Sequence, residues 1–341
     1  MIYYYSAYGL TLESQTAIAG LSPVTTHHEF LHPNPIEVAI SNCPAWAESA
    51  LQLPAEPAYP AATAIRPSGL TFQLLRHGGG QFYQLSYADG SQFVVDAETR
   101  RIWGGCPASL TQEDLVTYLV GPVLGFVLRR RGVLALHASS FCKEGFAFAL
   151  CGGPGAGKST SSAALALQGV SILCEDITAL RERNAVFWTA PGYPRVNLWP
   201  ESAGNLFGNP LAIPKITPTW EKRFLALDDT LGKFESQERP LAAIYLLAAR
   251  RDSDHAPHFE EISAREALLQ LVQNTYMNYL LATEQRAAEF DLVARLVSGT
   301  VVRRVVPHSD PARLPAMCEL LQTDSATIAV KMNRAPASQL L

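Results

Sequence analysis

The sequence has few charged residues and almost no net charge. Asp, Glu, Lys and Arg make up 17% of the 341 residues, and the formal net charge is −4 at pH 7. A chain with so small a net charge has no general electrostatic attraction to nucleic acid or to anionic lipid. We therefore expect neither a nucleic acid nor a membrane as a partner.

Cysteines and long apolar segments are also scarce. The six cysteines include no C-x-x-C pair, which favours buried free thiols in a reducing compartment over a disulfide framework or a zinc site. The uncharged run Leu115–Leu128 is too short to span a bilayer. The first residues, Met1–Tyr5, lack the basic and apolar regions of a signal peptide, so we expect a cytoplasmic protein.

One glycine-rich stretch has the pattern G-x-x-x-x-G-K-[ST] of a P-loop. It follows the apolar run Gly145–Cys151, which predicts a strand, and it precedes the run Thr160–Gln168, which predicts a helix that Gly169 should end. A strand, a glycine-rich turn and a helix in this order are the context that the pattern requires. The stretch consists of Gly152, Gly153, Pro154, Gly155, Ala156, Gly157, Lys158, Ser159 and Thr160.

The residue types in this stretch suit a nucleoside triphosphate. Glycines allow successive backbone N–H groups to face one phosphate group, and the N-terminus of the helix adds its partial positive charge. We expect Lys158 to reach the β- and γ-phosphates of ATP and the Ser159 hydroxyl to bind Mg²⁺. The alternative is a glycine-rich turn that binds nothing.

An acidic pair follows the next predicted strand. The run Val170–Cys174 is apolar and ends at Glu175-Asp176. In α/β sheets, ligands bind beyond the carboxyl ends of the strands. Asp176 is therefore a candidate for holding Mg²⁺ together with Ser159, and also for accepting a proton during phosphoryl transfer. The alternative is an acid that serves only the turn at the end of the strand.

Two further basic segments follow the acidic pair. Arg195 lies in a proline-rich loop, where we expect it either to hold a phosphate or a substrate carboxylate or to pair with a neighbouring acid. Lys215, Lys222 and Arg223 lie on a polar stretch, which either covers the site or forms a solvated face. The residue pattern leaves both pairs of alternatives open.

The first part of the chain predicts strands followed by a kinked helix. Residues 1 to about 110 are β-rich, with a strand over Ile2–Leu12 and a hairpin turn at Gly78–Gly80. Thr111 is a plausible N-cap for a helix that runs to Arg131, with a kink at Gly121-Pro122. We expect this β-rich region to be a separate domain and a candidate for substrate binding.

The second part of the chain predicts alternating strands and helices. The run Val133–Phe141 predicts a strand, and the capping box that starts at Ser263 predicts a long helix with apolar positions to Leu280. Leu314–Leu321 predicts a short helix, and from about Asp324 we expect a frayed tail. The order favours an α/β domain over residues 111–323 and a flexible tail over residues 324–341.

Several of these segments together resemble a known family. Leu136-His137-Ala138-Ser139, the P-loop and Glu175-Asp176 occur in the order and close spacing found in the catalytic domain of HPr kinase/phosphorylase. The stretches Tyr5–Ser14 and Pro191–Pro200 are similar to a divergent subgroup, the HPr-kinase-related serine kinases. Some members of this subgroup phosphorylate the C-terminal serine of a lasso-peptide precursor. The resemblance is good over roughly residues 130–200 and weak over most of the remainder.

The resemblance implies a fold, an activity and a set of site residues. It implies an α/β kinase core of the HPr kinase/PEP carboxykinase type, which uses ATP and Mg²⁺ to phosphorylate a serine hydroxyl, and a homo-oligomer of unspecified size. It places His137 near the γ-phosphate or the acceptor, unless His137 only closes a strand. The implied catalytic residues are Asp176, Glu175, His137, Lys158 and Arg195.

The chain also departs from the family pattern. The acidic pair of the family is usually Asp-Asp, whereas the first member here is Glu175, so the metal-binding and proton-accepting roles stay divided between Glu175 and Asp176. The later conserved block of the bifunctional enzyme is not found, which favours a kinase without phosphorylase activity. The open alternatives are an HPr-type regulatory kinase, a small-molecule kinase or PEP-carboxykinase-like enzyme, and a nucleotide-binding regulator without chemistry.

Overall fold

The computed structural model describes residues 1–24, 34–59, 63–65, 71–280 and 282–334 of the chain. The chain folds into two compact units. The N-terminal unit comprises residues 1–132, 217–220 and 279–286, and the C-terminal unit comprises residues 133–216, 221–278 and 287–341. The division after Gly132 differs from the expected one near residue 110, because the helices that follow Thr111 pack on the N-terminal sheet.

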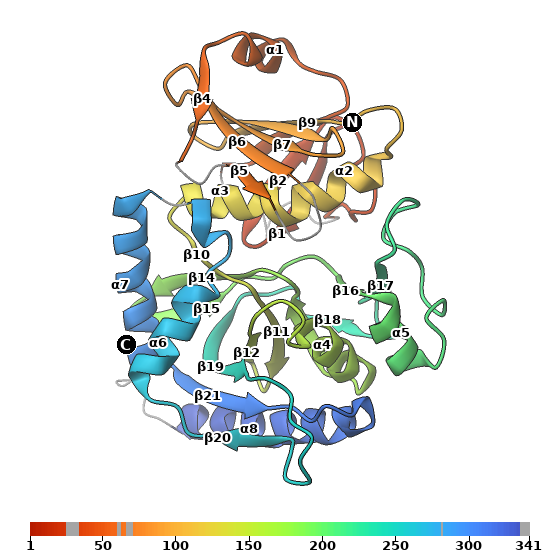
Figure 1. Cartoon of the computed structure of the whole chain (residues 1–341), viewed down its shortest axis with the longest axis vertical. Coiled ribbons are helices and arrows are strands. Elements are labelled where there is room, and N and C mark those ends of the chain that lie inside the picture. The colour runs from red at the N-terminus through yellow and green to blue at the C-terminus, as the bar shows by residue number, and fades with distance from the viewer. Residues whose placement is uncertain (25–33, 60–62, 66–70, 281, 335–341) are drawn as a thin grey trace. The chain divides into compact units, whose positions relative to one another are not determined.

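A nine-stranded sheet forms most of the N-terminal unit (Figure 1). Its order is β1-β2-β3-β9-β8-β7-β6-β4, with β5 also paired to β6. The strands are β1 Tyr3–Ala7, β2 Leu10–Ser14, β3 Ile36–Ile40, β4 Ala55–Pro57, β5 Thr63–Ile65, β6 Thr71–His77, β7 Phe82–Tyr87, β8 Gln92–Asp96 and β9 Arg101–Gly105.

One turn of this sheet lies where the sequence predicts it, and another was not predicted. The three glycines Gly78–Gly80 have positive φ and join β6 to β7, as predicted. The strand expected over Ile2–Leu12 is instead the hairpin β1–β2. Its turn lies at Tyr8-Gly9, where both residues have positive φ. A left-handed tyrosine is uncommon, so the sequence carried little signal for this turn.

Helices accompany the N-terminal sheet. The helix α1 (Ala45–Leu51) packs its alanines against β8 and β9. Thr111 caps α2 (Gln112–Tyr118) through a capping box with Asp114, which confirms the predicted start. A π-helical turn at Leu119–Val123 then leads to α3 (Leu124–Arg130). The interruption falls at Gly121-Pro122 as predicted, because Pro122 has no backbone N–H for the helical ladder.

A mixed ten-stranded sheet forms the centre of the C-terminal unit. Its order is β10-β14-β15-β19-β12-β11-β13-β18, and β21 pairs with both β19 and β20. The strands are β10 Leu134–Leu136, β11 Ala138–Lys143, β12 Phe146–Cys151, β13 Ser171–Cys174, β14 Thr178–Arg183, β15 Val186–Thr189, β18 Lys233–Phe234, β19 Arg239–Leu247, β20 His258–Glu260 and β21 Val301–Val306. A separate two-stranded ladder joins β16 (Arg195–Leu198) to β17 (Arg223–Ala226).

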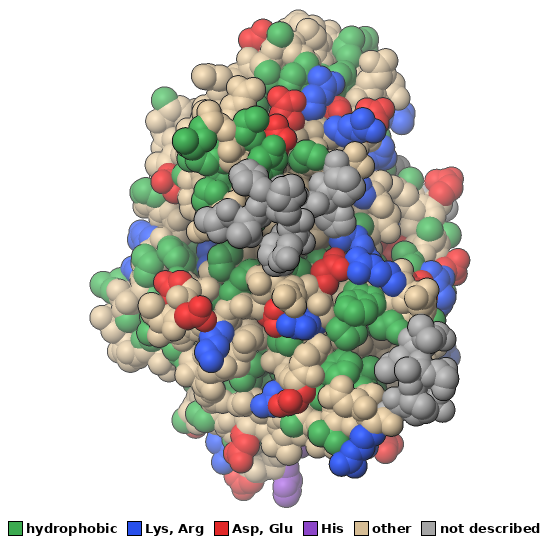
Figure 2. Space-filling view, turned by 180° about the vertical axis from the view of Figure 1, so that it is seen from behind, with side chains coloured by type: hydrophobic (Ala, Val, Ile, Leu, Met, Phe, Trp, Pro, Cys, Tyr) green, Lys and Arg blue, Asp and Glu red, His purple; other side chains and the backbone are tan. Residues whose placement is uncertain are grey.

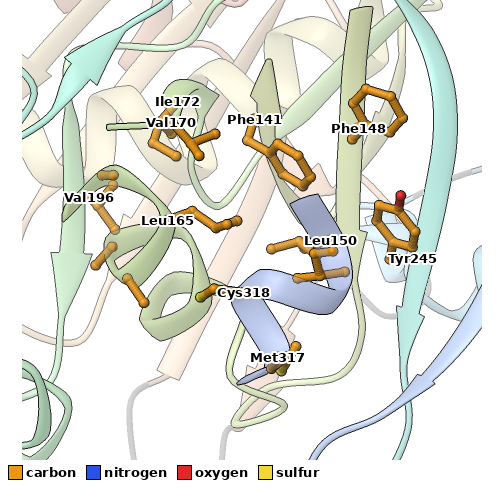
Figure 3. Packing of buried hydrophobic residues seen from close by; sticks show 14 of the residues in the cluster. Phe141, Phe148, Leu150, Leu165, Val170, Ile172, Val196, Tyr245, Met317 and Cys318 are labelled. Atoms are coloured by element: carbon orange, nitrogen blue, oxygen red, sulfur yellow. The ribbon is translucent and has the colours of Figure 1, made fainter. Parts of the chain in front are cut away.

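Helices cover both faces of this sheet, so the unit has a mixed α/β architecture. One face packs against α4 (Lys158–Leu167), α5 (Pro200–Phe207) and α8 (Leu314–Arg334), and the other packs against α6 (Ala264–Gln273) and the later part of α7 (Thr283–Gly299). Figure 3 shows the first of these cores, in which Leu165 of α4 and Cys318 of α8 meet side chains of the sheet. The rings of Phe141, Phe148 and Tyr245 stack there on three neighbouring strands.

Three sequence predictions for the C-terminal unit need correction. The strand expected over Val133–Phe141 is interrupted at His137, which separates β10 from β11. The helix that starts at Ser263 ends at Gln273 instead of continuing to Leu280. The helix α8 continues to Arg334, because it buries residues such as Ile328 and Ala329, and so the tail is not frayed from Asp324. The last part of the expected tail, residues 335–341, lies outside the described residues.

The described residues include no candidate membrane-spanning helix. No helix within the described residues combines the length and the apolar character that crossing a membrane would need. The face in Figure 2 shows Lys, Arg, Asp and Glu side chains interspersed among hydrophobic and other side chains. All six cysteines are free thiols; Cys151, Cys174 and Cys318 are buried as the sequence predicts, whereas Cys43, Cys106 and Cys142 are only partly buried.

Candidate functional site

Strand register brings three separate segments to one edge of the C-terminal sheet. The strand β11 is antiparallel to both β12 and β13, with Ala138 opposite Cys151 and Ser140 opposite Cys174. The beginning of β11 therefore lies beside the carboxyl ends of β12 and β13. His137 precedes β11, the glycine-rich loop Gly152–Gly157 follows β12, and Glu175 follows β13, so all three predicted segments meet at this edge.

The glycine-rich loop turns directly into helix α4. Gly155 and Gly157 have φ of +78° and +103°, a conformation that residues with a Cβ rarely adopt, and Gly157 occupies the N-cap position of α4. A Cβ added at Gly152 would lie 3.1 Å from the Cβ of Ala156 and 3.3 Å from the backbone oxygen of Leu247. The backbone thus needs glycine at these positions to curl towards the helix N-terminus.

Lys158 closes over the loop that precedes it. Its Nζ donates hydrogen bonds to the backbone oxygens of Gly152 at 2.6 Å and Gly153 at 3.1 Å, and the residue is only 6% exposed. Burial lowers the pKa of Lys158, while the nearby charges of Cys151, Asp176 and Glu175 oppose this shift. The ammonium group is therefore held by acceptors that an anionic ligand at the loop could replace.

The Ser159 hydroxyl contacts Glu175 rather than Asp176. Its Oγ donates to Glu175 Oε1 at 2.6 Å, and Asn197 Nδ2 donates to Glu175 Oε2 at 3.2 Å. Glu175 is 6% exposed. Burial raises the pKa of the Glu175 carboxyl, and the negative charge of Asp176 raises it further, against the opposing effect of the Ser159 hydrogen bond. A cation at this position would relieve an unfavourable buried charge.

Asp176 has a different set of partners, although it is the next residue. Its backbone is left-handed, with φ of +67°, and its side chain is 37% exposed. His137 Nδ1 lies 3.2 Å from Asp176 Oδ1, and the Tyr276 hydroxyl donates to Oδ2 at 3.4 Å. Burial acts to raise the pKa of Asp176, but the hydrogen bond and charge of His137, with the charges of Lys222 and Lys158, outweigh it and lower the pKa.

The segment after α6 holds His137 and Tyr276 in place. The His137 backbone N–H donates to the Asn274 oxygen, and the Tyr276 backbone N–H donates to the Ala135 oxygen, both at 2.8 Å. The His137 and Tyr276 rings lie 6.0 Å apart. His137 is thus not only a polar residue that closes a strand, because its ring reaches the carboxylate of the acidic pair.

Arg195 begins β16 and is almost completely buried, at 7% exposed. Its guanidinium carbon lies 4.9 Å from the centre of the Tyr193 ring and 5.8 Å from that of Phe224. Its Nε and Nη2 atoms have no hydrogen-bond partner, and among the described residues it forms no salt bridge. Among the described residues, cation–π contacts hold the side chain, and the ion pair that the sequence left open as one alternative is not formed.

The residues Asn197, Tyr276 and Lys222 complete the site, and the sequence did not single them out as catalytic. Asn197 lies only two residues after Arg195, so its position beside the predicted site gave some signal. Tyr276 comes from a segment about 100 residues after the acidic pair, and only the bridge between Leu136 and Thr275 brings it close. All of these side chains belong to the C-terminal unit.

The oxygen ligands at this edge fit a magnesium ion that is shared with a phosphate. Among the described residues, no group of three or more His, Cys, Asp and Glu side chains could hold a metal by itself. Mg²⁺ in phosphoryl-transfer sites usually takes only one or two protein carboxylates, with phosphate oxygens and water completing its octahedron. The Ser159 hydroxyl and the Glu175 carboxylate, 2.6 Å apart, match such a partial ligand set.

Solved structures of other proteins include chains that are similar to this one. The chain is similar to the structure of the Hpr(Ser) kinase/phosphatase from Coxiella burnetii, with 14% sequence identity and a TM-score of 0.32. The match covers 58% of this chain and 98% of that chain. No protein-family model and no curated protein matches the sequence.

Proposed function

We propose that this chain is a kinase of the HPr-kinase-related type, which uses ATP and Mg²⁺ to phosphorylate a serine hydroxyl on a peptide or protein. The observation that carries the proposal is the shared sheet edge, where the glycine-rich loop and Lys158 lie beside the Glu175-Asp176 pair and His137. A phosphate nest, a lysine, a hydroxyl for the metal and a carboxylate for the acceptor are the parts that phosphoryl transfer needs.

The partners of the two acids support separate roles for them. Glu175 contacts Ser159, which supports Glu175 as the metal-binding acid, in contrast to the sequence expectation that favoured Asp176. Asp176 is half-exposed and paired with His137, which supports Asp176 as the group that accepts the serine proton. Mg²⁺, when bound, would neutralise negative charge on the β- and γ-phosphates. The backbone N–H groups of the loop and Lys158 would bind the same phosphates.

The acceptor that we propose is the C-terminal serine of a lasso-peptide precursor. This choice is supported by the sequence resemblance of Tyr5–Ser14 and Pro191–Pro200 to the subgroup that acts on such precursors. A cytoplasmic site of action and assembly into a homo-oligomer belong to the same proposal. Arg195 would then act beside the phosphate or a substrate carboxylate through the part of its side chain that remains exposed.

A mass measurement tests the proposal. We expect incubation with ATP, Mg²⁺ and a candidate precursor peptide to add the mass of one phosphate to the peptide. Lys158→Ala should lower the rate by about 10²–10³-fold and Asp176→Asn by about 10²–10⁴-fold, because the first removes charge stabilisation and the second removes the base. Lys331→Ala and Asp291→Asn, which alter exposed helical residues, serve as matched controls.

The outcome also separates the alternatives. Near-normal rates in both Lys158→Ala and Asp176→Asn would remove this mechanism. ATP binding without transfer to any peptide or protein would favour a nucleotide-binding regulator. Transfer to HPr or to a small hydroxyl compound, with none to the precursor, would keep the kinase and replace the acceptor.

A further inference from the structure

Phosphoryl transfer spreads negative charge over three equatorial oxygens, and one lysine on the loop faces only one side of them. Phosphoryl-transfer enzymes commonly add a further cation, such as an arginine finger in GTPases or a second Mg²⁺ in protein kinases. The C-terminal unit has several basic side chains near the sheet edge, and they differ in whether they already form salt bridges or are buried. A role for one of them in the transfer rests on the proposed kinase function.

Lys222 stands at the end of the β16–β17 ladder. In this ladder Leu198 pairs with Arg223, so Trp199 and Lys222 are the next residues on the two strands. The Lys222 ammonium nitrogen lies 5.0 Å from the centre of the Trp199 ring, within the range of a cation–π contact. Trp199 is itself 60% exposed, so the pair faces solvent rather than the core.

Two hydrogen bonds hold this ladder against the proposed active site. Asn197 of β16 donates to Glu175 at 3.2 Å. Thr160, on the first turn of α4, donates from Oγ1 to Ser202 Oγ at 2.9 Å, and Ser202 lies on the first turn of α5, which Trp199 precedes. The chain on either side of Trp199 is therefore tied to the acidic pair and to the helix that starts at the glycine-rich loop.

In the described part of the chain, the Lys222 ammonium group contacts an aromatic ring and pairs with no acid. Its ammonium group forms no hydrogen bond or salt bridge with a described residue. Its charge nevertheless acts on both acids, lowering the pKa of Asp176 and opposing the rise in the pKa of Glu175. Lys215, by contrast, is paired with Glu221 at 2.8 Å, and the buried guanidinium of Arg195 packs against two rings.

We propose that Lys222 is a catalytic residue that contacts the transferred phosphoryl group, with Trp199 holding its ammonium group in position. In the transfer, the bond between the γ-phosphorus and the β,γ-bridging oxygen breaks, and its electron pair leaves with ADP. The acceptor oxygen forms the new bond to phosphorus and its proton passes to Asp176. The positive charge of Lys222 stabilises the equatorial oxygens.

Affinity for a transition-state analogue tests this role without an identified acceptor. We would measure the affinity of the full chain for MgADP alone and for MgADP with aluminium fluoride. A group that acts in the transition state should matter for the second complex and not for the first. We expect Lys222→Met to weaken the aluminium fluoride complex by about 10²–10³-fold while MgADP affinity stays within about twofold.

Two further variants keep the result interpretable. Lys222→Arg retains the charge and should recover part of the loss, whereas Lys233→Met, on an exposed lysine of β18, should change neither affinity. Equal aluminium fluoride affinity in wild type and Lys222→Met would overturn the inference and leave the proposed function standing. A wild-type chain that binds no MgADP would overturn both, and a Lys222→Met chain that loses MgADP binding as well would show a structural role instead.

Discussion

The substitution Glu175→Gln should stabilise the protein while weakening its use of the metal. Glu175 is 6% exposed, and both burial and the charge of Asp176 raise its pKa, so the ionised carboxyl is disfavoured in the folded protein. Glutamine keeps the shape and the acceptor for the Ser159 hydroxyl. The Asn197 amide can rotate, because its Oδ1 has no partner and can accept from the new amide.

The expected gain follows from the balance of these contacts. The variant removes a buried charge and its repulsion with Asp176, and it converts a charge-assisted hydrogen bond from Ser159 into a neutral one. The pKa of Glu175 is raised, which means that burial and repulsion by Asp176 outweigh the stabilising hydrogen bond from Ser159. Removing the charge should therefore stabilise the protein more than weakening that hydrogen bond destabilises it. We expect a gain in the free energy of unfolding on the order of 1 kcal/mol. This corresponds to about 2–4 °C in Tm for a domain of this size.

The pH dependence of the gain has a defined sign. Below the ordinary glutamate pKa of 4.5, Glu175 is neutral in both the folded and the unfolded chain and costs nothing. As the pH rises from there through the raised folded pKa, the unfolded chain loses its proton first, and the wild type loses stability. The Tm difference between Glu175→Gln and wild type should thus be small below the ordinary glutamate pKa and should grow as the pH rises through the raised folded pKa.

Calorimetry with and without Mg²⁺ and ADP measures both parts of this prediction. MgADP should raise the Tm of wild type more than ADP alone does. In Glu175→Gln the two ligands should raise the Tm by nearly the same amount. Glu319→Gln, on an exposed glutamate of α8, is the matched control and should leave both quantities unchanged. A Glu175→Gln protein that melts at or below the wild-type temperature at about pH 8 would refute the electrostatic reasoning.

Two other predictions concern the loop and the core. Gly157→Ala places a Cβ on a backbone with φ of +103°, where it would lie 3.2 Å from Arg250 Nη2. We expect this variant to lower the free energy of unfolding by about 1–2 kcal/mol, measured by urea titration. We also expect it to weaken MgADP binding, measured by calorimetry. Leu165→Ala empties a fully buried position and should lower stability by about 2–5 kcal/mol in urea titration, whereas Leu167→Ala on the same helix, 38% exposed, should cost far less. Equal losses for Leu165 and Leu167 would contradict the packing of α4.

Local patterns predicted many of the elements correctly. The capping residues Thr111 and Ser263, the interruption at Gly121-Pro122 and the glycine turn Gly78–Gly80 are all where the sequence places them. Each depends on neighbouring residues alone, so no long-range contact can override it easily. The helix ends at Gln273 and Arg334 were missed because tertiary packing, rather than local propensity, decides where those helices stop.

The sequence by itself determined the parts of the candidate site: a glycine-rich loop between a strand and a helix, a lysine and a serine at its end, and two acids after the following strand. Only the tertiary structure decided how these parts meet. The antiparallel strand β11 lies between β12 and β13 and brings His137, Gly152 and Glu175 to one edge. The left-handed turn at Asp176 sends the two adjacent carboxylates to different partners, and neither strand register nor that turn can be read from neighbouring residues.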